Sequence, residues 1–385
     1  MKSEEIYFDN AATTKVDEKV LKEMMPYFYE KFGNASSQHI KGTEAKEALE
    51  NSRKKIADKL NAKPSEIFFT SGGTEGNNFV LKGLWFHQTE NKTGKNHIIT
   101  TRIEHDSILK VCEWLEKQGC KITYLDVDSN GFINLEELKK AITKNTFLVS
   151  VIHANNEIGT IQEIEDVGKI CKSSKVFFHT DACQSFMKIL LDTKKLDVDF
   201  ITLNAHKIHG PKGVGALYIK EGLEKKIVPL FHGGGHEKGL RSGTENIPGI
   251  VGFAKSVELI NKKDVEKITK LRDKLIFELT RNKNVKLNGP RGKNRLCNNV
   301  NVLVKGIDGE ALGGFLESYG IYTSTGSACL SNSSGESHVL KALGLSKKDS
   351  QSALRITLSK YSTDDEVDYF LNKFKETVKK VGGFS

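Results

Sequence analysis

Side chains suited to carbonyl and acid–base chemistry follow successive apolar segments of the chain. The first group is a glycine-rich turn, residues 71–78, in which Gly73 and Thr74 open a predicted helix. Glycine lets a ligand approach the backbone closely, and a helix start offers free N–H groups, so this turn predicts a phosphate site. Taken alone, the turn fits a plain strand-to-helix connection equally well, and it is neither a P-loop nor a dinucleotide fingerprint.

The later segments end in an imidazole, an amide, a carboxylate and an amine. In chain order these groups are His105, Asn156, Asp181 with Gln184, and Asn204 with His206 and Lys207. A single histidine or lysine is usually a structural or surface residue. Together with a phosphate cradle, however, they are the groups that hold pyridoxal phosphate, because a lysine can bind its aldehyde and an acid can keep its pyridine nitrogen protonated.

The elements that must position these groups alternate between strand and helix. The predicted strands are Ile67–Thr70, His97–Thr101, Lys121–Val127, Phe147–His153, Val176–His179, Phe200–Leu203 and Gly215–Ile219. Amphipathic helices are predicted between them at Ile108–Gln118 and Leu135–Ile142. This alternation predicts an α/β fold with a mostly parallel sheet covered on both faces, and ligands beyond the carboxyl ends of the strands.

The pattern changes near residue 261. A smaller α+β domain is predicted there from the helix Asp264–Arg281, the strand Asn299–Val304, and the helices Glu310–Ser318 and Thr363–Lys380. We therefore expect residues 16–260 to form the large domain. Residues 1–15 and 261–385 are expected to form the small domain, which would carry a cysteine-containing loop.

Composition limits the class of protein. The 385 residues are 38% hydrophobic and 28% charged, which is typical of a globular protein with a large core and excludes disorder. No apolar run approaches the ~20 residues of a membrane helix, and acids near the start do not fit a signal peptide. The net charge of +9 comes from lysines interleaved with acids. We expect a cytoplasmic protein with no membrane partner and no direct nucleic-acid partner.

The six cysteines form no C-x-x-C pair and match no zinc module, which fits a reducing compartment and predicts no resident metal site. Cys329 stands in the segment 324–332, which is rich in serine, glycine and asparagine. Such surroundings are typical of an accessible loop, so Cys329 is the candidate nucleophile. Cys183, between Asp181 and Gln184, is the rival candidate.

Six short motifs, in order along essentially the whole chain, resemble those of the cysteine desulfurases. They are residues 9–14, 33–37, 71–78, 155–159, 206–207 and 241–244. The resemblance is to the NifS/IscS branch of the class V aminotransferase family, and it implies the type I fold of pyridoxal-phosphate enzymes. The implied reaction removes sulfur from L-cysteine, releases L-alanine and leaves a persulfide on Cys329. An acceptor protein would take the sulfur for iron–sulfur cluster assembly or tRNA thiolation.

The resemblance also implies a role for each candidate residue. Lys207 would bind the cofactor and move the proton at the substrate α-carbon, and His105 would stack on the ring and take part in proton transfer. The other implied cofactor-binding residues are Gly73, Thr74, Asn156, Asp181, Gln184, Asn204 and His206. Thr244 would reach the phosphate of a neighbouring subunit, which implies a homodimer.

The substrate carboxylate would bind to Arg355, with Asn34 and Asn156 nearby, because a guanidinium recognises carboxylates in a bidentate manner. Cys329 is also implied as a transient iron–sulfur ligand.

Three departures from the family pattern stand in the sequence. Asn204 replaces a usual serine, Ala35 replaces a common proline, and residues 357–360 differ mildly from the usual run after the carboxylate-binding arginine. None of these changes removes a reactive group. Two alternative functions stay open. One is another enzyme of the class V group, either an aminotransferase or a selenocysteine lyase. The other is a non-catalytic sulfur scaffold or RNA-docking protein that merely keeps the fold.

Overall fold

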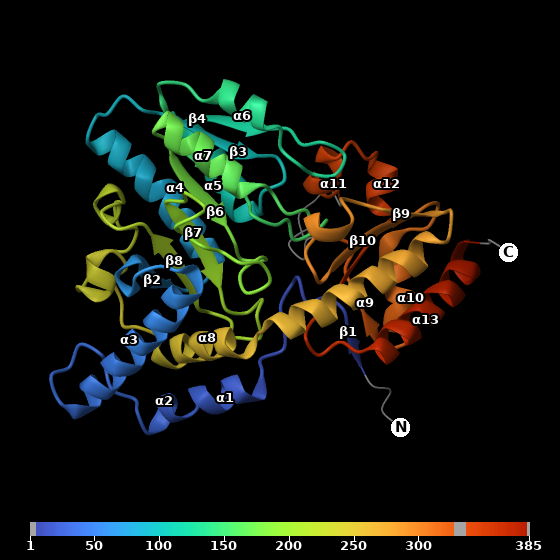
Figure 1. The fold of residues 1–385 in the computed structure, drawn as a ribbon, viewed down its shortest axis with the longest axis horizontal. Coiled ribbons are helices and arrows are strands. Elements are labelled where there is room, and N and C mark those ends of the chain that lie inside the picture. The colour runs from blue at the N-terminus through green and yellow to red at the C-terminus, as the bar shows by residue number, and fades with distance from the viewer. Residues whose placement is uncertain (1–4, 327–335, 383–385) are drawn as a thin grey trace.

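The computed structural model describes residues 5–326 and 336–382, which form two lobes (Figure 1). The larger lobe contains the main sheet and the helices that cover it. The smaller lobe contains β9 (Val285–Leu287), β10 (Asn299–Val304) and the last helix, α13 (Asp364–Gly382). Within these described ranges, no helix combines the length and the apolar character needed to cross a membrane.

The large lobe is built on a seven-stranded sheet with the order β2-β8-β7-β6-β5-β3-β4. Its strands are β2 (Ile67–Thr70), β3 (His97–Thr101), β4 (Lys121–Leu125), β5 (Thr146–Ser150), β6 (Phe177–Asp181), β7 (Phe200–Asn204) and β8 (Gly215–Ile219). The pairs from β4 to β7 are parallel, whereas β8 is antiparallel to both of its neighbours. The predicted α/β fold with a mostly parallel sheet is therefore confirmed.

The carboxyl ends of two central strands lie further along the chain than the sequence predicts. The predicted strands end at His179 and Leu203, but β6 continues to Asp181 and β7 to Asn204. Asp181 pairs with Thr202 in the ladder, and backbone pairing of this kind outweighs the weak strand preference of Asp and Asn. The predictions at Lys121–Val127 and Phe147–His153 are too long instead, since β4 and β5 end at Leu125 and Ser150.

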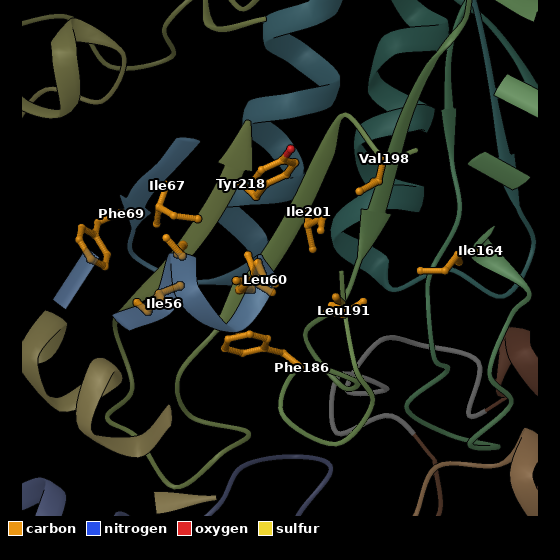
Figure 2. Close-up of a cluster of buried hydrophobic side chains, with 14 of the residues drawn as sticks. Ile56, Leu60, Ile67, Phe69, Ile164, Phe186, Leu191, Val198, Ile201 and Tyr218 are labelled. Carbon is orange, nitrogen blue, oxygen red and sulfur yellow. The ribbon is translucent and has the colours of Figure 1, made fainter. Parts of the chain in front are cut away.

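Helices cover both faces of the main sheet. One face carries α3 (Ile40–Leu60), α6 (Leu135–Ala141), α7 (Ile164–Ser174) and α8 (Ile247–Leu259). The other face carries α4 (Gly73–Glu90) and α5 (Asp106–Lys117). Alternate residues of β2 enter the two cores, Ile67 on the first face and Phe68 on the second. Figure 2 shows Ile56 and Leu60 of α3 among the side chains of the first core.

The small lobe has its own core. The antiparallel sheet β12-β10-β9, where β12 is Ala353–Thr357, and the parallel pair β1 (Ile6–Tyr7) with β11 (Ile321–Tyr322) form its strands. Its helices are α9 (Lys262–Thr280), α10 (Gly309–Glu317), α11 (His338–Ala342), α12 (Lys347–Gln351) and α13. One apolar cluster joins Ile6 and Phe8 to side chains between residues 268 and 378. The first strand of the chain therefore packs with the C-terminal part, and the division of the chain after residues 15 and 260 stays a prediction.

Asp17 ties the two lobes together. Its carboxylate accepts hydrogen bonds from the Lys360 ammonium (2.5 Å) and the Tyr361 hydroxyl (2.6 Å), and it caps α1 (Glu18–Met24) through the Lys19 N–H. The Asp17 N–H donates to the backbone carbonyl of His209. A single residue therefore connects the first helix, the loop after Lys207 and the C-terminal part of the small lobe.

Replacing Asp17 with asparagine should destabilise the fold. Burial alone would raise the pKa of Asp17, but the hydrogen bonds from Lys360 and Tyr361 hold it well below its ordinary value. A lowered carboxyl pKa stabilises the fold above the unfolded pKa of about 3.9, and this contribution is lost as the pH falls below it. In urea unfolding at neutral pH we expect Asp17→Asn to lower the unfolding free energy by about 2 kcal/mol.

The matched control is Asp58→Asn, which removes one partner of the exposed Lys54–Asp58 pair on α3. That change should alter the unfolding free energy by less than about 0.5 kcal/mol. The difference between Asp17→Asn and the unmodified chain should also shrink below about pH 4, where the Asp17 carboxyl becomes protonated in the unfolded chain while it stays ionised in the folded one. Equal effects of the two substitutions at neutral pH would show that the Asp17 contacts do not join the lobes.

Candidate active site

A cavity of about 270 Å³ lies beside the carboxyl ends of β6 and β7. Ten of the predicted site residues line it: Gly73, Thr74, His105, Asn156, Asp181, Gln184, Asn204, His206, Lys207 and Arg355. Ala11, Ala12, Ser107, Ile152 and Cys183 complete the lining. Residues from the two lobes and from the N-terminal segment therefore meet at one place, as expected for a sheet whose parallel strands end there.

Two predicted site residues in the described part of the chain do not line this cavity. Asn34 is exposed in the segment that follows α2 (Pro26–Tyr29), and Thr244 is exposed just before α8. Neither residue lines the cavity of this single chain. Cys329 lies outside the described residues. The roles expected for these three residues remain predictions.

One end of the cavity suits a phosphate. Helix α4 starts at Gly73, and its N-cap, Gly72, has no side chain with which to bond the first N–H groups. A Cβ atom on Gly73 would stand 2.5 Å from the Cys183 sulfur and 3.7 Å from the Asn204 amide nitrogen, so glycine keeps this end open. Thr74 and His206 line the same cavity. Free helix N–H groups with a threonine hydroxyl attract an anion.

A chain of hydrogen bonds fixes the opposite end. The Asn77 amide donates to the Asp181 carboxylate (2.7 Å) and to the Ser107 hydroxyl (2.8 Å), and that hydroxyl lies 2.8 Å from Nδ1 of His105. His105 Nδ1 also accepts from the Ser107 N–H, which places His105 at the N-cap of α5. Because Nδ1 is an acceptor, the neutral ring carries its proton on Nε2.

Asn77 and Ser107 are functional residues that the sequence interpretation missed. The signal was present but weak. Asn77 follows Thr74 by three residues and so lies on the same helix face, and Ser107 occupies the position that a helix N-cap side chain reaches. Spacing of this kind places the residues near the site, but it does not show that both bond to one network.

The Lys207 amine is buried between two backbone carbonyls. It donates to the carbonyl of Ala12 at 2.6 Å and to that of Ala11. Burial lowers the pKa of Lys207 to about 8, and the charge of Arg355 adds to this effect. A lysine held in this way is uncharged in a sizeable fraction of molecules near neutral pH, and an uncharged amine can attack an aldehyde.

Arg355 reaches the cavity from β12 of the small lobe. Its guanidinium pairs with the Asp9 carboxylate at 2.8 Å and donates to the Asn156 carbonyl at 3.3 Å. Within the described part of the chain, the buried Nε of Arg355 has no hydrogen-bond partner. A buried guanidinium with an unused donor is suited to a ligand carboxylate.

The geometry argues against Cys183 as the nucleophile. Burial raises the pKa of the Cys183 thiol well above its ordinary value, and the neighbouring charge of Asp181 raises it further. Only a thiolate is a strong nucleophile, so Cys183 is poorly reactive at neutral pH. Among the residues that the structure describes, no group of three histidine, cysteine or acidic side chains is arranged to hold a metal ion.

These observations fit pyridoxal phosphate. The cradle that Gly73 keeps open matches the phosphate, the Asp181 carboxylate matches a pyridinium nitrogen, and the buried Lys207 amine matches an aldehyde. The cavity volume of about 270 Å³ is of the order needed for a small cofactor with an amino-acid substrate.

Comparisons with known proteins agree with this geometry. "Cysteine desulfurase IscS" of Clostridium botulinum is 46% identical over 383 residues, which cover 98% of this chain and 95% of that protein. "Cysteine desulfurase IscS" of Methanosarcina thermophila is also 46% identical, over 99% of this chain and 93% of that protein.

Solved structures give the same result. One described as a NifS-like protein superposes with a TM-score of 0.90 at 44% identity, over 98% of this chain and 100% of the other. A second, described as SspA in complex with cysteine, has a TM-score of 0.83 at 40% identity, over 93% and 100% of the two chains. The fold is therefore the type I fold of pyridoxal-phosphate enzymes. The class-V aminotransferase family matches residues 6–370, and this chain belongs to that family.

Proposed function

We infer that this chain is a pyridoxal-phosphate-dependent cysteine desulfurase. It takes sulfur from L-cysteine, releases L-alanine, and by our proposal keeps the sulfur as a persulfide on Cys329. The observation that carries the inference is the meeting of Lys207, Asp181 and Arg355 around one cavity. Full-length relatives that are 46% identical and named cysteine desulfurases support the same activity.

Different residues of the cavity would bind different parts of the cofactor. Bound pyridoxal phosphate supplies an electron sink for the substrate α-carbon. Gly73, Thr74, Asn204 and His206 would bind the phosphate, and Asp181, oriented by Asn77, would keep the ring nitrogen protonated. Gln184, whose amide donates to the Ala11 carbonyl, would lie beside the ring oxygen, and His105 would stack on the ring.

The other residues would bind the substrate and move its protons and its sulfur. Arg355, with Asn156 and Asn34, would hold the carboxylate, and the uncharged Lys207 amine would remove the α-proton. The Cys329 thiolate then attacks the substrate sulfur. An S–S bond forms, the C–S bond breaks, and its electron pair returns to the substrate carbon, which is protonated to give alanine.

The sulfur leaves on an acceptor protein in this proposal. A persulfide passes its outer sulfur to an acceptor thiolate, as required for iron–sulfur cluster assembly or tRNA thiolation. Transient ligation of an iron–sulfur cluster by Cys329 belongs to the same proposal. The five described cysteines are free thiols, which supports function in a reducing compartment such as the cytoplasm.

A homodimer is also part of the proposal. The side chains of Leu21, Met25, Phe28, Tyr29 and Phe32 on α1, α2 and the following turn are between 43% and 67% exposed. An exposed apolar patch of this kind marks an interaction surface. Asn34 follows the patch directly, and both Asn34 and Thr244 are exposed. A second copy of the chain would cover the patch and would receive Thr244 at its phosphate site.

Cofactor uptake should depend on pH through Lys207. Because the pKa of Lys207 is lowered to about 8, the charged form dominates below this pH and the reactive uncharged form increases as the pH rises. We expect the rate of cofactor binding by cofactor-free protein to rise by about tenfold per pH unit below pH 8 and to level off above it. The rate is followed by the visible absorbance of the bound cofactor.

The control pair for that experiment is Lys207→Ala and Lys212→Ala. Lys212 is exposed in the same loop, so its loss should leave both the absorbance and the pH midpoint unchanged. Loss of the visible band in Lys212→Ala, but not in Lys207→Ala, would show that the cofactor binds Lys212 and that its assignment to Lys207 is wrong.

Replacement of Cys329 separates desulfuration from the other reactions of this cofactor. Cys329→Ala should bind the cofactor and L-cysteine normally, yet release alanine about a hundredfold more slowly and gain no sulfur in intact-mass measurements. Cys183→Ala should still gain one sulfur. Persulfide on Cys329→Ala but not on Cys183→Ala would reverse the assignment. Alanine formation that requires a keto acid would favour the aminotransferase alternative, and a chain that binds no cofactor would favour the non-catalytic one.

Replacing both Phe28 and Phe32 with serine should weaken the dimer. Loss of two aromatic anchors from the patch should raise the dimer dissociation constant by about a hundredfold, as seen by light scattering over a dilution series. Phe277→Ser is the matched control, because Phe277 is 63% exposed on α9 of the small lobe, away from the patch. A dimer that dissociates in the control and persists in the double variant would place the interface elsewhere.

A further inference from the structure

A second partly buried lysine, Lys188, lines the same narrow gap as Lys207, the proposed cofactor lysine. It follows β6 in the turn that carries Gln184, and its ammonium donates to the Gln184 carbonyl at 2.9 Å. Lys188 and Lys207 both line a narrow gap of about 20 Å³ between the two lobes, together with Thr14 and His209. Lys188 and Lys207 therefore line the same narrow gap from the loops that follow two neighbouring strands of the main sheet, β6 and β7.

The backbone before Lys188 is held in an unfavourable conformation. Met187 has a φ angle of 63°, in the left-handed region that residues other than glycine rarely adopt. Such a conformation costs about 1–2 kcal/mol. The strained residue, Met187, directly precedes Lys188, which lines the gap. Backbone strain of this kind is often found where a functional geometry requires it.

Apart from Asp264, the other ionisable groups around the two lysines are paired or uncharged. Lys360 is paired with Asp17 at 2.5 Å, Arg355 with Asp9 at 2.8 Å, and the Asp264 carboxylate accepts from the Asn261 N–H at the start of α9. Burial lowers the pKa of His209 and of His206 to about 4, so both imidazoles are neutral. Burial raises the pKa of the Cys183 and Cys297 thiols, which are therefore also neutral.

No carboxylate lies within 4 Å of either amine in the described part of the chain, and both lysines are partly buried. Burial lowers the pKa of Lys188 to about 8, the value also found for Lys207. In an enclosed space each positive charge disfavours the other, because little water or counter-charge screens the repulsion. An ammonium on Lys188 therefore favours a neutral amine on Lys207.

We propose that Lys188 is a positioning residue of the reaction, whose enclosed charge keeps the Lys207 amine in the uncharged form that binds the cofactor and takes up the substrate proton. The proposal rests on the proposed function only because that function assigns cofactor binding and proton uptake to Lys207. Arg355, the other cation that lowers the pKa of Lys207, is paired with Asp9, whereas Lys188 donates to the backbone carbonyl of Gln184.

The test uses the full-length chain and two substitutions. Lys188→Met keeps an unbranched side chain of similar length and removes the charge, whereas Lys188→Arg keeps the charge. The reactivity of Lys207 toward acetic anhydride is measured across pH in cofactor-free protein by peptide mass spectrometry. We expect the midpoint for Lys207 to rise by about half a pH unit or more in Lys188→Met, and to stay near the original value in Lys188→Arg. Lys212→Met should also leave it unchanged.

The bound cofactor gives a second readout. The pH midpoint of its visible absorbance reports the protonation of the Lys207 nitrogen, and it should move in the same direction in Lys188→Met. An unchanged midpoint in both measurements would overturn the proposal, and so would equal shifts in Lys188→Met and Lys188→Arg, since these would indicate altered packing. If Lys188→Met fails to fold, Lys188→Gln makes the same test with a polar neutral side chain.

The test also separates this proposal from the proposed function. Addition of pyridoxal phosphate should protect Lys207 from the reagent if Lys207 is the cofactor lysine. Absence of protection would contradict the proposed function, whereas the midpoint shift depends only on the two amines and is read without the cofactor.

Discussion

The hydrogen bond from Asn77 to Asp181 is the contact on which the geometry of the site depends. It joins the second turn of α4, a helix whose first N–H groups face the phosphate end of the cavity, to the last residue of β6, which faces the ring end. The distance between phosphate and ring nitrogen is fixed in the cofactor, so the protein must fix the distance between these two elements. One buried amide does so, and the same amide reaches His105 through Ser107.

The remaining groups reach the cavity from segments far apart in the chain. Arg355 comes from β12, and the carbonyls that hold Lys207 come from Ala11 and Ala12, which precede the first helix. The Asp17 contacts with Lys360 and Tyr361 keep this N-terminal segment against the small lobe. The site is therefore complete only when both lobes and the first residues of the chain are packed together, which couples stability of the lobe junction to binding.

Most of the fold and much of the site could be predicted from the sequence, for identifiable reasons. Parallel strands alternate with helices in a regular pattern, and the residues that end those strands must meet at one edge, so Asp181 and Lys207 could be placed together before the structure was known. Asn77, Ser107 and Lys188 could not be assigned in this way. Their importance comes from contacts across the fold, and a polar residue on a helix face has the same sequence signal whether it faces water or a buried carboxylate.

Burial at the lobe junction has opposite chemical consequences for an amine and a thiol. Removing water disfavours the charged form of each, so the pKa of Lys207 falls while that of Cys183 rises. The same enclosed space that makes a lysine nucleophilic therefore makes a cysteine unreactive. A sulfur acceptor cannot be one of the thiols of this cavity; it must be brought to the substrate from a better-solvated position. The serine- and glycine-rich composition of segment 324–332 predicts such a position for its cysteine, and this is the physical reason to prefer Cys329 over Cys183.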